Sequence, residues 1–356
     1  MADLGMMGGR YFEHFTFGDM IMHGVPRTLT SGDASLYQSL YGGRNPLFCA
    51  RPVAEAIGLK DMPLDSWLVF HIVFGKTVAD ISRHAVANLG YAQGFFNAPV
   101  FVGDTLTAYS EVIGLRQNKS GESGLVMVRT SSLNQHSEMV LSFVRWVMVK
   151  KCNKNLAAPE TVWPDMAAPV APAQVPPPLG DFSHWQARDT GSDMFFEDYQ
   201  AGMKISHGDG TTLEEAEHML ATRLYQNNAA VHFDAQLQSQ SRFGKRLVYG
   251  GHMISHIASM AFNGIGNLAG YAALNGGSHT APCFAGDTLY GWSEILDKTA
   301  FENRDDVGAL RLRHIMLKNR PQQAENGDFI DRSENGDLHQ DVVLELDVWA
   351  YIAIRR

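Results

Sequence analysis

Residues 11–24, YFEHFTFGDMIMHG, return in altered form at residues 195–208 as FFEDYQAGMKISHG. Seven positions carry identical or aromatic partners at a constant offset of 184, among them Glu13 with Glu197 and His23 with His207. A second pair of blocks follows at an offset of 183, APVFVGDTLTAYSE at 98–111 and APCFAGDTLYGWSE at 281–294. Two matched blocks in the same order indicate a duplicated chain, in which each half has the size of one domain.

A segment rich in proline and alanine separates the two copies. Residues 156–180 read LAAPETVWPDMAAPVAPAQVPPPLG, a composition typical of an extended linker. We therefore expect an N-terminal domain over residues 1–155, a linker over 156–190 that can cross a domain face, and a C-terminal domain over 191–356.

Both halves show the same order of predicted elements. A first strand region and a turn-rich polar segment precede one long helix, predicted over 71–87 and over 251–263. Strands follow, predicted at 100–116, 123–134 and 138–151 in the first half and at 284–298, 308–318 and 339–354 in the second. The short connections favour antiparallel pairing.

One helix wrapped by an antiparallel sheet, present twice, is the tandem (double) hotdog arrangement, an α+β fold. We expect the two halves to pair through their sheets. Residues 319–338 are polar and rich in Gly, Asn and Asp, which predicts a mobile hairpin loop. The triplet Gly286-Asp287-Thr288 is interpreted as a turn, and the repeated His23 and His207 as residues with a shared structural role.

Composition limits the classes of function. The 356 residues carry a net charge of -9 with a pI of about 5.8, which argues against nucleic acid or an anionic membrane as partner. The three cysteines, Cys49, Cys152 and Cys283, are far apart and lack metal-ligand spacing, so neither disulfides nor a zinc site are expected. No targeting segment or membrane span is apparent, which predicts a soluble cytoplasmic protein.

The stretch from Tyr225 to Met253, YQNNAAVHFDAQLQSQSRFGKRLVYGGHM, combines groups suited to thioester chemistry. His232 can move a proton near neutral pH, and Asn227 precedes it by five residues. Gly250 and Gly251 precede the predicted helix, where free backbone N–H groups suit a developing oxyanion. A hydrogen-bonded structural histidine and an ordinary glycine turn are the alternatives for the same residues.

At these residues the second half resembles the MaoC-type enoyl-CoA hydratases, also called hydratase 2. Their motif is Asp-x-Asn-Pro-(Ile/Leu)-His-x-Asp, followed by a Phe-Gly-basic-basic turn and a glycine at the start of the central helix. His232 and Asp234 fall on the motif His and the second Asp, Phe243-Gly244-Lys245-Arg246 on the turn, and Gly250 on the helix-start glycine. Within this family, the whole chain is similar to the mesaconyl-CoA hydratases (β-methylmalyl-CoA dehydratases).

The chain departs from the motif in both halves. Asn227 stands at the position of the catalytic Asp, and Ala229-Ala230 replace Asn-Pro. In the first half Gly43 lies opposite Asn227 and Phe48 opposite His232, although Asn45-Pro46-Leu47 keep the backbone-shaping residues. We therefore expect one active site per chain, in the second half, with Phe48 lining the acyl pocket or serving only as a core residue.

The resemblance implies reversible hydration of an α,β-unsaturated acyl-CoA, such as mesaconyl-CoA to β-methylmalyl-CoA. His232 would act as acid and base, the N–H of Gly250 or Gly251 as oxyanion donor, and Asn227 would orient water because an amide accepts no proton. Either His232 performs all proton transfer or a carboxylate from elsewhere assists, and Asp234 is interpreted as structural. No cofactor is implied, because CoA is part of the substrate, and no metal.

A dicarboxylic substrate needs a cation for its free carboxylate. Arg44 is the first candidate, ahead of Arg223, Arg242 and Arg246; Phe48 and Tyr249 complete the expected acyl pocket. Lys245 and Arg246 suit the CoA phosphates. His252 and His256 lie one turn apart on the second predicted helix and are interpreted as core or pocket-lining residues.

Three alternatives remain for the function. The chain could hydrate another branched or dicarboxylic enoyl-CoA such as itaconyl-CoA, since pocket shape is not readable from sequence. It could be an acyl-CoA thioesterase, because hotdog folds also host hydrolases, or a non-catalytic acyl-CoA-binding protein, as Asn227 suggests. The expected partner is an acyl-CoA in each case, with further assembly into a homo-oligomer.

Overall fold

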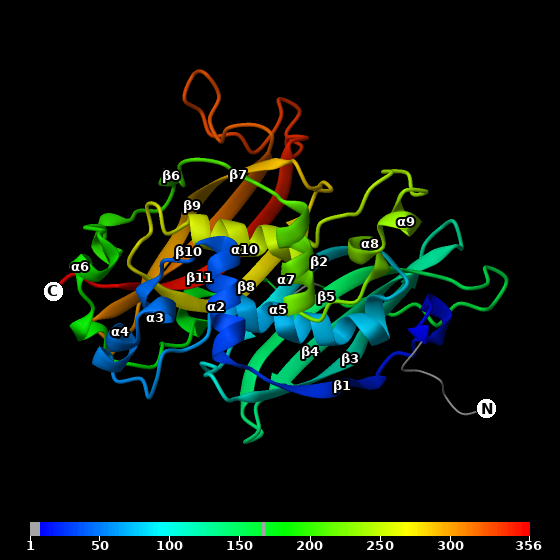
Figure 1. Cartoon of the computed structure of the whole chain (residues 1–356), viewed down its shortest axis with the longest axis horizontal. Coiled ribbons are helices and arrows are strands. Elements are labelled where there is room, and N and C mark those ends of the chain that lie inside the picture. Colours follow the sequence, from blue (N-terminus) through cyan, green and yellow to red (C-terminus); the bar gives the residue numbers. More distant parts are fainter. Residues whose placement is uncertain (1–7, 166–167) are drawn as a thin grey trace.

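The strands form one antiparallel sheet that runs through both halves, as the computed structural model, which describes residues 8–165 and 168–356, shows (Figure 1). The strand order is β1-β3-β4-β5-β2-β8-β11-β10-β9-β6, with β7 paired to β9. The bounds are β1 (Met20–Thr28), β2 (Ala85–Phe96), β3 (Thr105–Gln117), β4 (Ser123–Leu133), β5 (Met139–Lys150), β6 (Lys204–Ser206), β7 (Thr211–Thr212), β8 (Leu268–His279), β9 (Thr288–Ala300), β10 (Val307–Lys318) and β11 (Val342–Ala353).

Four helices, labelled α2, α5, α7 and α10, lie together on one face of this sheet (Figure 1). The helices are α2 (Ser31–Tyr41), α3 (Pro46–Cys49), α4 (Arg51–Ala56), α5 (Ser66–Thr77, continued by a π turn over Val78–Ser82), α6 (Ala187–Thr190), α7 (Glu215–Leu224), α8 (Ala230–Phe233), α9 (Ala235–Gln238) and α10 (Gly250–Met260). Short 3₁₀ turns occur at Phe12–His14, Pro172–Gln174, Phe182–His184 and Phe196–Asp198. The double hotdog is therefore confirmed, with α5 and α10 as its central helices.

The two halves are joined by antiparallel pairing of β2 with β8. Tyr91 pairs with Gly277 and Phe95 with Ala273. The expected pairing of the halves through their sheets is thus confirmed, and it makes one continuous sheet from two copies. Because the sheet is continuous, the helices α5 and α10 share one core, in which Phe70, Ile254 and Ile257 are fully buried.

Residues that repeat between the halves have matching structural roles. His23 and His207 each bond through Nε2 to a serine hydroxyl, Ser110 at 2.7 Å and Ser293 at 2.6 Å. These two serines are themselves a repeated pair. The structural interpretation of the repeated histidines is therefore confirmed. The turn interpretation of Gly286-Asp287-Thr288 agrees with the carboxylate of Asp287, which accepts from the backbone N of Phe284 at 2.9 Å. The repeated Asp104 makes the same contact with the N of Phe101 at 2.8 Å.

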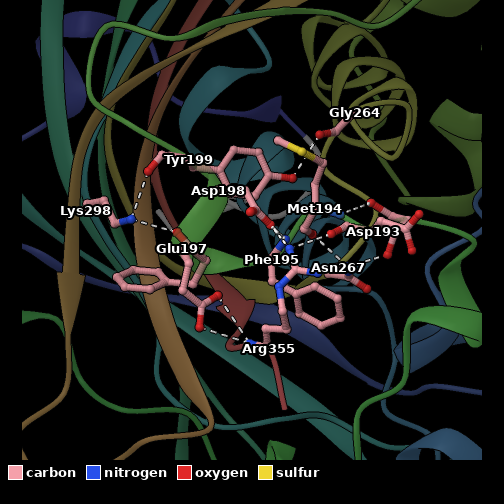
Figure 2. Close-up of polar contacts among 12 residues, drawn as sticks. Asp193, Met194, Phe195, Glu197, Asp198, Tyr199, Gly264, Asn267, Lys298 and Arg355 are labelled. Atoms are coloured by element: carbon pink, nitrogen blue, oxygen red, sulfur yellow. Dashed lines mark hydrogen bonds and ion pairs between the residues drawn. The ribbon is translucent and has the colours of Figure 1, made fainter.

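The repeated glutamates hold the ends of the last strands. Glu13 accepts from the backbone N of Cys152 at 3.1 Å, and Glu197 from that of Arg355 at 3.2 Å. Figure 2 shows the second of these contacts, with Lys298 donating to the carbonyl of Tyr199 at 2.8 Å beside it. Lys298 also donates to the carbonyl of Phe196 at 2.7 Å. The start of the second copy is thereby fixed to its sheet.

Several predicted boundaries differ from the structure. The first central helix begins at Ser66, because the Asp65 side chain caps it by accepting from the N of Trp67 at 2.8 Å. It ends before residues 85–87, which belong to β2. The strands β2 and β8 were not predicted, because their glycines and alanines hide the usual β signal. The segments interpreted as polar turns contain the helices α2 and α7.

The linker covers the outer face of the C-terminal sheet. Phe182 and Trp185 pack there against Val307 and other residues that point away from α10. Trp349 reaches out to the linker, donating from Nε1 to the carbonyl of Val170 at 2.9 Å. Residues 319–338 form two short turns, and Ile330 is buried there beside Trp292, whose Nε1 donates to the Ile330 carbonyl at 3.0 Å. No helix within the described ranges is long and apolar enough to cross a bilayer.

A close backbone contact between the halves gives a first test. A Cβ on Gly75 of α5 would lie 1.8 Å from the carbonyl oxygen of Tyr225, whereas a Cβ on Gly43 would meet nothing within 4 Å. We expect Gly75→Ala to lower the free energy of unfolding by about 1–3 kcal/mol, because backbone must move. Gly43→Ala is the matched control and should stay within about 0.5 kcal/mol of the wild type in urea denaturation. Equal stability of both variants would contradict this packing.

Candidate active site

His232 is a buried, neutral base whose orientation is fixed. Its Nδ1 donates to the carbonyl oxygen of Leu247 at 2.7 Å, so its Nε2 carries the free lone pair. Burial lowers the pKa of His232 to about 4, although the Leu247 hydrogen bond acts in the opposite direction. The imidazole is therefore uncharged at neutral pH and able to accept a proton.

The start of α10 lies next to His232. Tyr249 is the N-cap residue, its side chain makes no capping hydrogen bond, and its ring centroid is 5.7 Å from that of His232. Gly250 and Gly251 are the first two helical residues, whose N–H groups have no partner within the helix. The expected base and the expected oxyanion donors are thus brought together, at the positive end of an 11-residue helix.

Asn227 lies in a tight turn between α7 and α8. Its side chain is 3% exposed, and its Oδ1 accepts from the backbone N of Ala229 at 3.1 Å. Asp234 caps α9 by accepting from the N of Leu237 at 2.8 Å. This contact agrees with the structural interpretation of Asp234. With Asp234 engaged as a helix cap, Asn227 is the other polar residue of the motif that could assist His232.

Two histidines that the sequence analysis did not select lie against the glycine pair. A Cβ on Gly251 would lie 2.5 Å from Nδ1 of His71, and one on Gly250 would lie 2.6 Å from Nε2 of His279. Only glycine allows these imidazoles so close to the helix start. Burial lowers the pKa of His71 to about 3 and that of His279 to about 4, so both are neutral. For His71, the sequence signal that could have identified it was its place as a polar residue within the apolar run WLVFHIVFG.

The basic turn before the helix lies at the outer end of this site. Lys245 is exposed and stands over the Phe284 ring, with Nζ 4.4 Å from its centroid. Arg246 forms an ion pair with Glu215, which also contacts His218. Lys245 is therefore the freer of the two cations for a ligand, whereas Arg246 already has a carboxylate partner.

Arg44 and Phe48 do not join this group. Arg44 donates to Asn263 Oδ1 and lies 4.8 Å from the Phe262 ring centroid, beyond the C-terminal end of α10. His232 lies near the other end of this helix, whose 11 residues span about 16 Å at 1.5 Å per residue. The sequence-based expectation that Arg44 and Phe48 share a pocket with His232 therefore differs from their placement in the structure.

Arg44 and Phe48 line a second cleft, which is the counterpart of the His232 site. Its lining includes Gly43, Asp65 and Ser255, which the 184-residue offset places opposite Asn227, Tyr249 and His71. Burial raises the pKa of Asp65 to about 6. Each motif loop also contacts the central helix region of the other half, Tyr225 at Gly75 and Arg44 at Asn263. The duplication therefore produces two related loop–helix sites with different side chains.

The comparisons with known proteins identify the family of the chain. A sequence profile described as mesaconyl-CoA hydratase matches residues 5–329. The chain is 51% identical to β-methylmalyl-CoA dehydratase of Chloroflexus aurantiacus, covering 95% of this chain and 96% of that protein. It is 49% identical to mesaconyl-CoA hydratase of Cereibacter sphaeroides, covering 97% and 98%.

Solved structures that resemble this chain also have the MaoC-like double hotdog fold. A MaoC domain dehydratase from Chloroflexus aurantiacus superposes with a TM-score of 0.94 at 50% identity, covering 98% of this chain and 99% of that one. A Mycobacterium tuberculosis protein with a double hotdog fold gives a TM-score of 0.76 at 27% identity, covering 97% and 99%. The fold and these relatives therefore define a MaoC-like hydro-lyase with two hotdog halves. The chain belongs to the mesaconyl-CoA hydratase family.

The lowered pKa of His232 predicts how stability depends on pH. The unfolded chain binds a proton at this residue below about pH 6.5, whereas the folded chain resists it until about pH 4. The free energy of unfolding should therefore fall as pH drops through this window, by about 1.4 kcal/mol per pH unit for each such histidine. In urea denaturation, His232→Gln should show a shallower fall than the wild type. An unchanged slope would contradict a neutral buried His232.

Proposed function

We propose that this protein catalyses the reversible hydration of mesaconyl-CoA to β-methylmalyl-CoA in the site formed by His232 and the start of α10. The observation that carries the proposal is a neutral imidazole, with its Nε2 free, beside an uncapped helix N-terminus. The names of the relatives that are 51% and 49% identical over nearly their whole length support the choice of substrate.

The proposed reaction needs one base and one anion site. The thioester oxygen would accept hydrogen bonds from the N–H groups of Gly250 and Gly251, which stabilise the enolate that forms during addition. His232 Nε2 would take one proton from water as the hydroxide oxygen bonds to C3. The imidazolium would then return that proton to C2, so one water is added and no other reactant is required.

Other residues would hold the substrate and the water. Asn227 can orient the attacking water through its amide, although its oxygen already accepts from the N of Ala229. Tyr249 is next to both His232 and the glycine pair, where it can contact the acyl group. The exposed ammonium of Lys245, with Arg246 beside it, suits the phosphates of the acyl-CoA.

The first test is turnover of mesaconyl-CoA by the purified protein without added metal or nucleotide. We expect loss of the enoyl-thioester absorbance and a product heavier by one water, with the thioester intact. His232→Gln keeps a donor for the Leu247 carbonyl but loses the base, so kcat/KM should fall by roughly 10²–10⁴-fold. The exposed His184 provides the control His184→Gln, which should be unchanged. Release of free CoA thiol would instead identify a thioesterase.

The amide at position 227 gives a separate test. In Asn227→Asp the carboxylate can still accept from the N of Ala229, and it restores the acid of the family motif. We expect a folded variant whose kcat/KM stays within about tenfold of the wild type, since the loop geometry is kept. Asn228→Asp adds the same charge to an exposed position of this loop and is the control. A folded Asn227→Asp variant without activity would show that the site depends on the amide.

A further inference from the structure

Arg145 on β5 is a buried cation without an anionic partner. Among the residues that the structure describes, it is the only arginine in the fully buried class, with 0% exposure. Its guanidinium donates to neutral oxygens alone, Thr77 Oγ1 at 2.7 Å, Ser82 Oγ at 3.4 Å and Asn88 Oδ1 at 3.4 Å. Its Nε has no hydrogen-bond partner in the described part of the chain.

This arrangement is costly for the fold. Burial lowers the pKa of Arg145 to about 10, so the group still carries its charge at neutral pH. A buried charge is normally compensated by an opposite charge. The partly buried arginines Arg311 and Arg313 follow that rule, since Arg311 Nη2 lies 2.6 Å from Asp347 and Arg313 Nε lies 2.6 Å from Glu345. Because the uncompensated guanidinium costs stability, we expect its role to lie in binding rather than in folding.

The second half serves as an internal control for this position. In the first half Arg145 pairs across the strands with Tyr91, and the corresponding pair in the second half is Val348 with Leu274. Val348 and Leu274 are both buried in the core. The hotdog fold thus fills the same place with aliphatic side chains, and it does not require the Arg145 charge.

Two aromatic side chains, Phe74 and Tyr249, connect Arg145 to the His232 site. Its Cζ lies 4.4 Å from the centroid of the Phe74 ring, and the Phe74 ring centroid lies 5.4 Å from that of Tyr249. Tyr249 in turn adjoins His232 and the glycine pair. The strand neighbour Tyr91 reaches His279, with its hydroxyl 3.3 Å from Nε2. Arg145 is therefore a buried cation close behind the aromatic residues that adjoin the His232 site.

We propose that Arg145 binds the free carboxylate of a dicarboxylic enoyl thioester and so selects dicarboxylic acyl groups. This inference rests on the proposed function and names the residue that gives that function its substrate class. In mesaconyl-CoA the carboxylate is attached to C3, the carbon that receives hydroxide. A guanidinium at this end pairs with the carboxylate charge and fixes C3 relative to the base, without taking part in proton transfer.

The test compares a charged and a neutral substrate. Arg145→Met should lower kcat/KM for mesaconyl-CoA by roughly 100-fold or more, because the substrate carboxylate loses its buried partner. For crotonyl-CoA, which lacks the carboxylate, kcat/KM should stay within about threefold. Arg145→Lys keeps the charge and should recover part of the mesaconyl-CoA activity. Arg129→Met replaces an exposed arginine of β4 and should leave both substrates unchanged.

Thermal unfolding separates recognition from a structural role. Arg145→Met should melt at the same temperature as the wild type or higher, since an apolar side chain replaces an uncompensated buried charge. A lower melting temperature together with equal losses on both substrates would overturn the proposal. So would an Arg145→Met enzyme that still prefers mesaconyl-CoA.

Binding distinguishes failure of this inference from failure of the proposed function. If the wild type hydrates neither substrate, the proposed function fails, and the melting temperature with each CoA ester still tests Arg145. A rise with mesaconyl-CoA that exceeds the rise with crotonyl-CoA, and that disappears in Arg145→Met, supports the carboxylate site. An equal rise with both esters in the wild type, or a preference that survives the substitution, overturns it.

Discussion

The antiparallel pairing of β2 with β8 is the contact on which the site depends. It joins two copies of the same fold edge to edge, so the central helices α5 and α10 come to lie in one core. The equivalent residues Tyr41 and Tyr225 meet there, with their hydroxyl oxygens 2.7 Å apart. Each motif loop consequently lies on the opposite central helix, as the contact of Gly75 with the Tyr225 carbonyl shows. Both halves therefore contribute to the surroundings of the His232 site, since His71 of the first half lies against Gly251.

Burial at this junction sets the chemistry of the groups it contains. His232, His71 and His279 are held neutral because desolvation disfavours their protonated forms. A neutral imidazole can accept a proton from water, and helix-terminal N–H groups act more strongly where water is excluded. The same exclusion of water makes the uncompensated charge of Arg145 expensive, which is why its presence is informative.

The duplication has kept the frame and changed the clefts. The repeated Glu13 and Glu197 still hold the ends of the last strands, and His23 and His207 still bond to the same repeated serines. The two loop–helix sites differ in their side chains, since Phe48 occupies the position that His232 has in the other half. A fold with two related sites can retain polar reactive groups in one site while the side chains of the other change, because the shared sheet stabilises both.

The sequence alone determined the duplication, the strands with clear alternation, and the motif from His232 to Gly251. These features are local, since repeated blocks, periodicity and spacing can be read along one chain. Tertiary structure decided that Arg44 and Phe48 face the second cleft, that His71 and His279 lie against the glycine pair, and that Arg145 is the buried cation. The strands β2 and β8, which join the halves, also escaped prediction. The reason is that these contacts join residues far apart in sequence, and only the antiparallel packing of the two halves fixes which loop covers which helix.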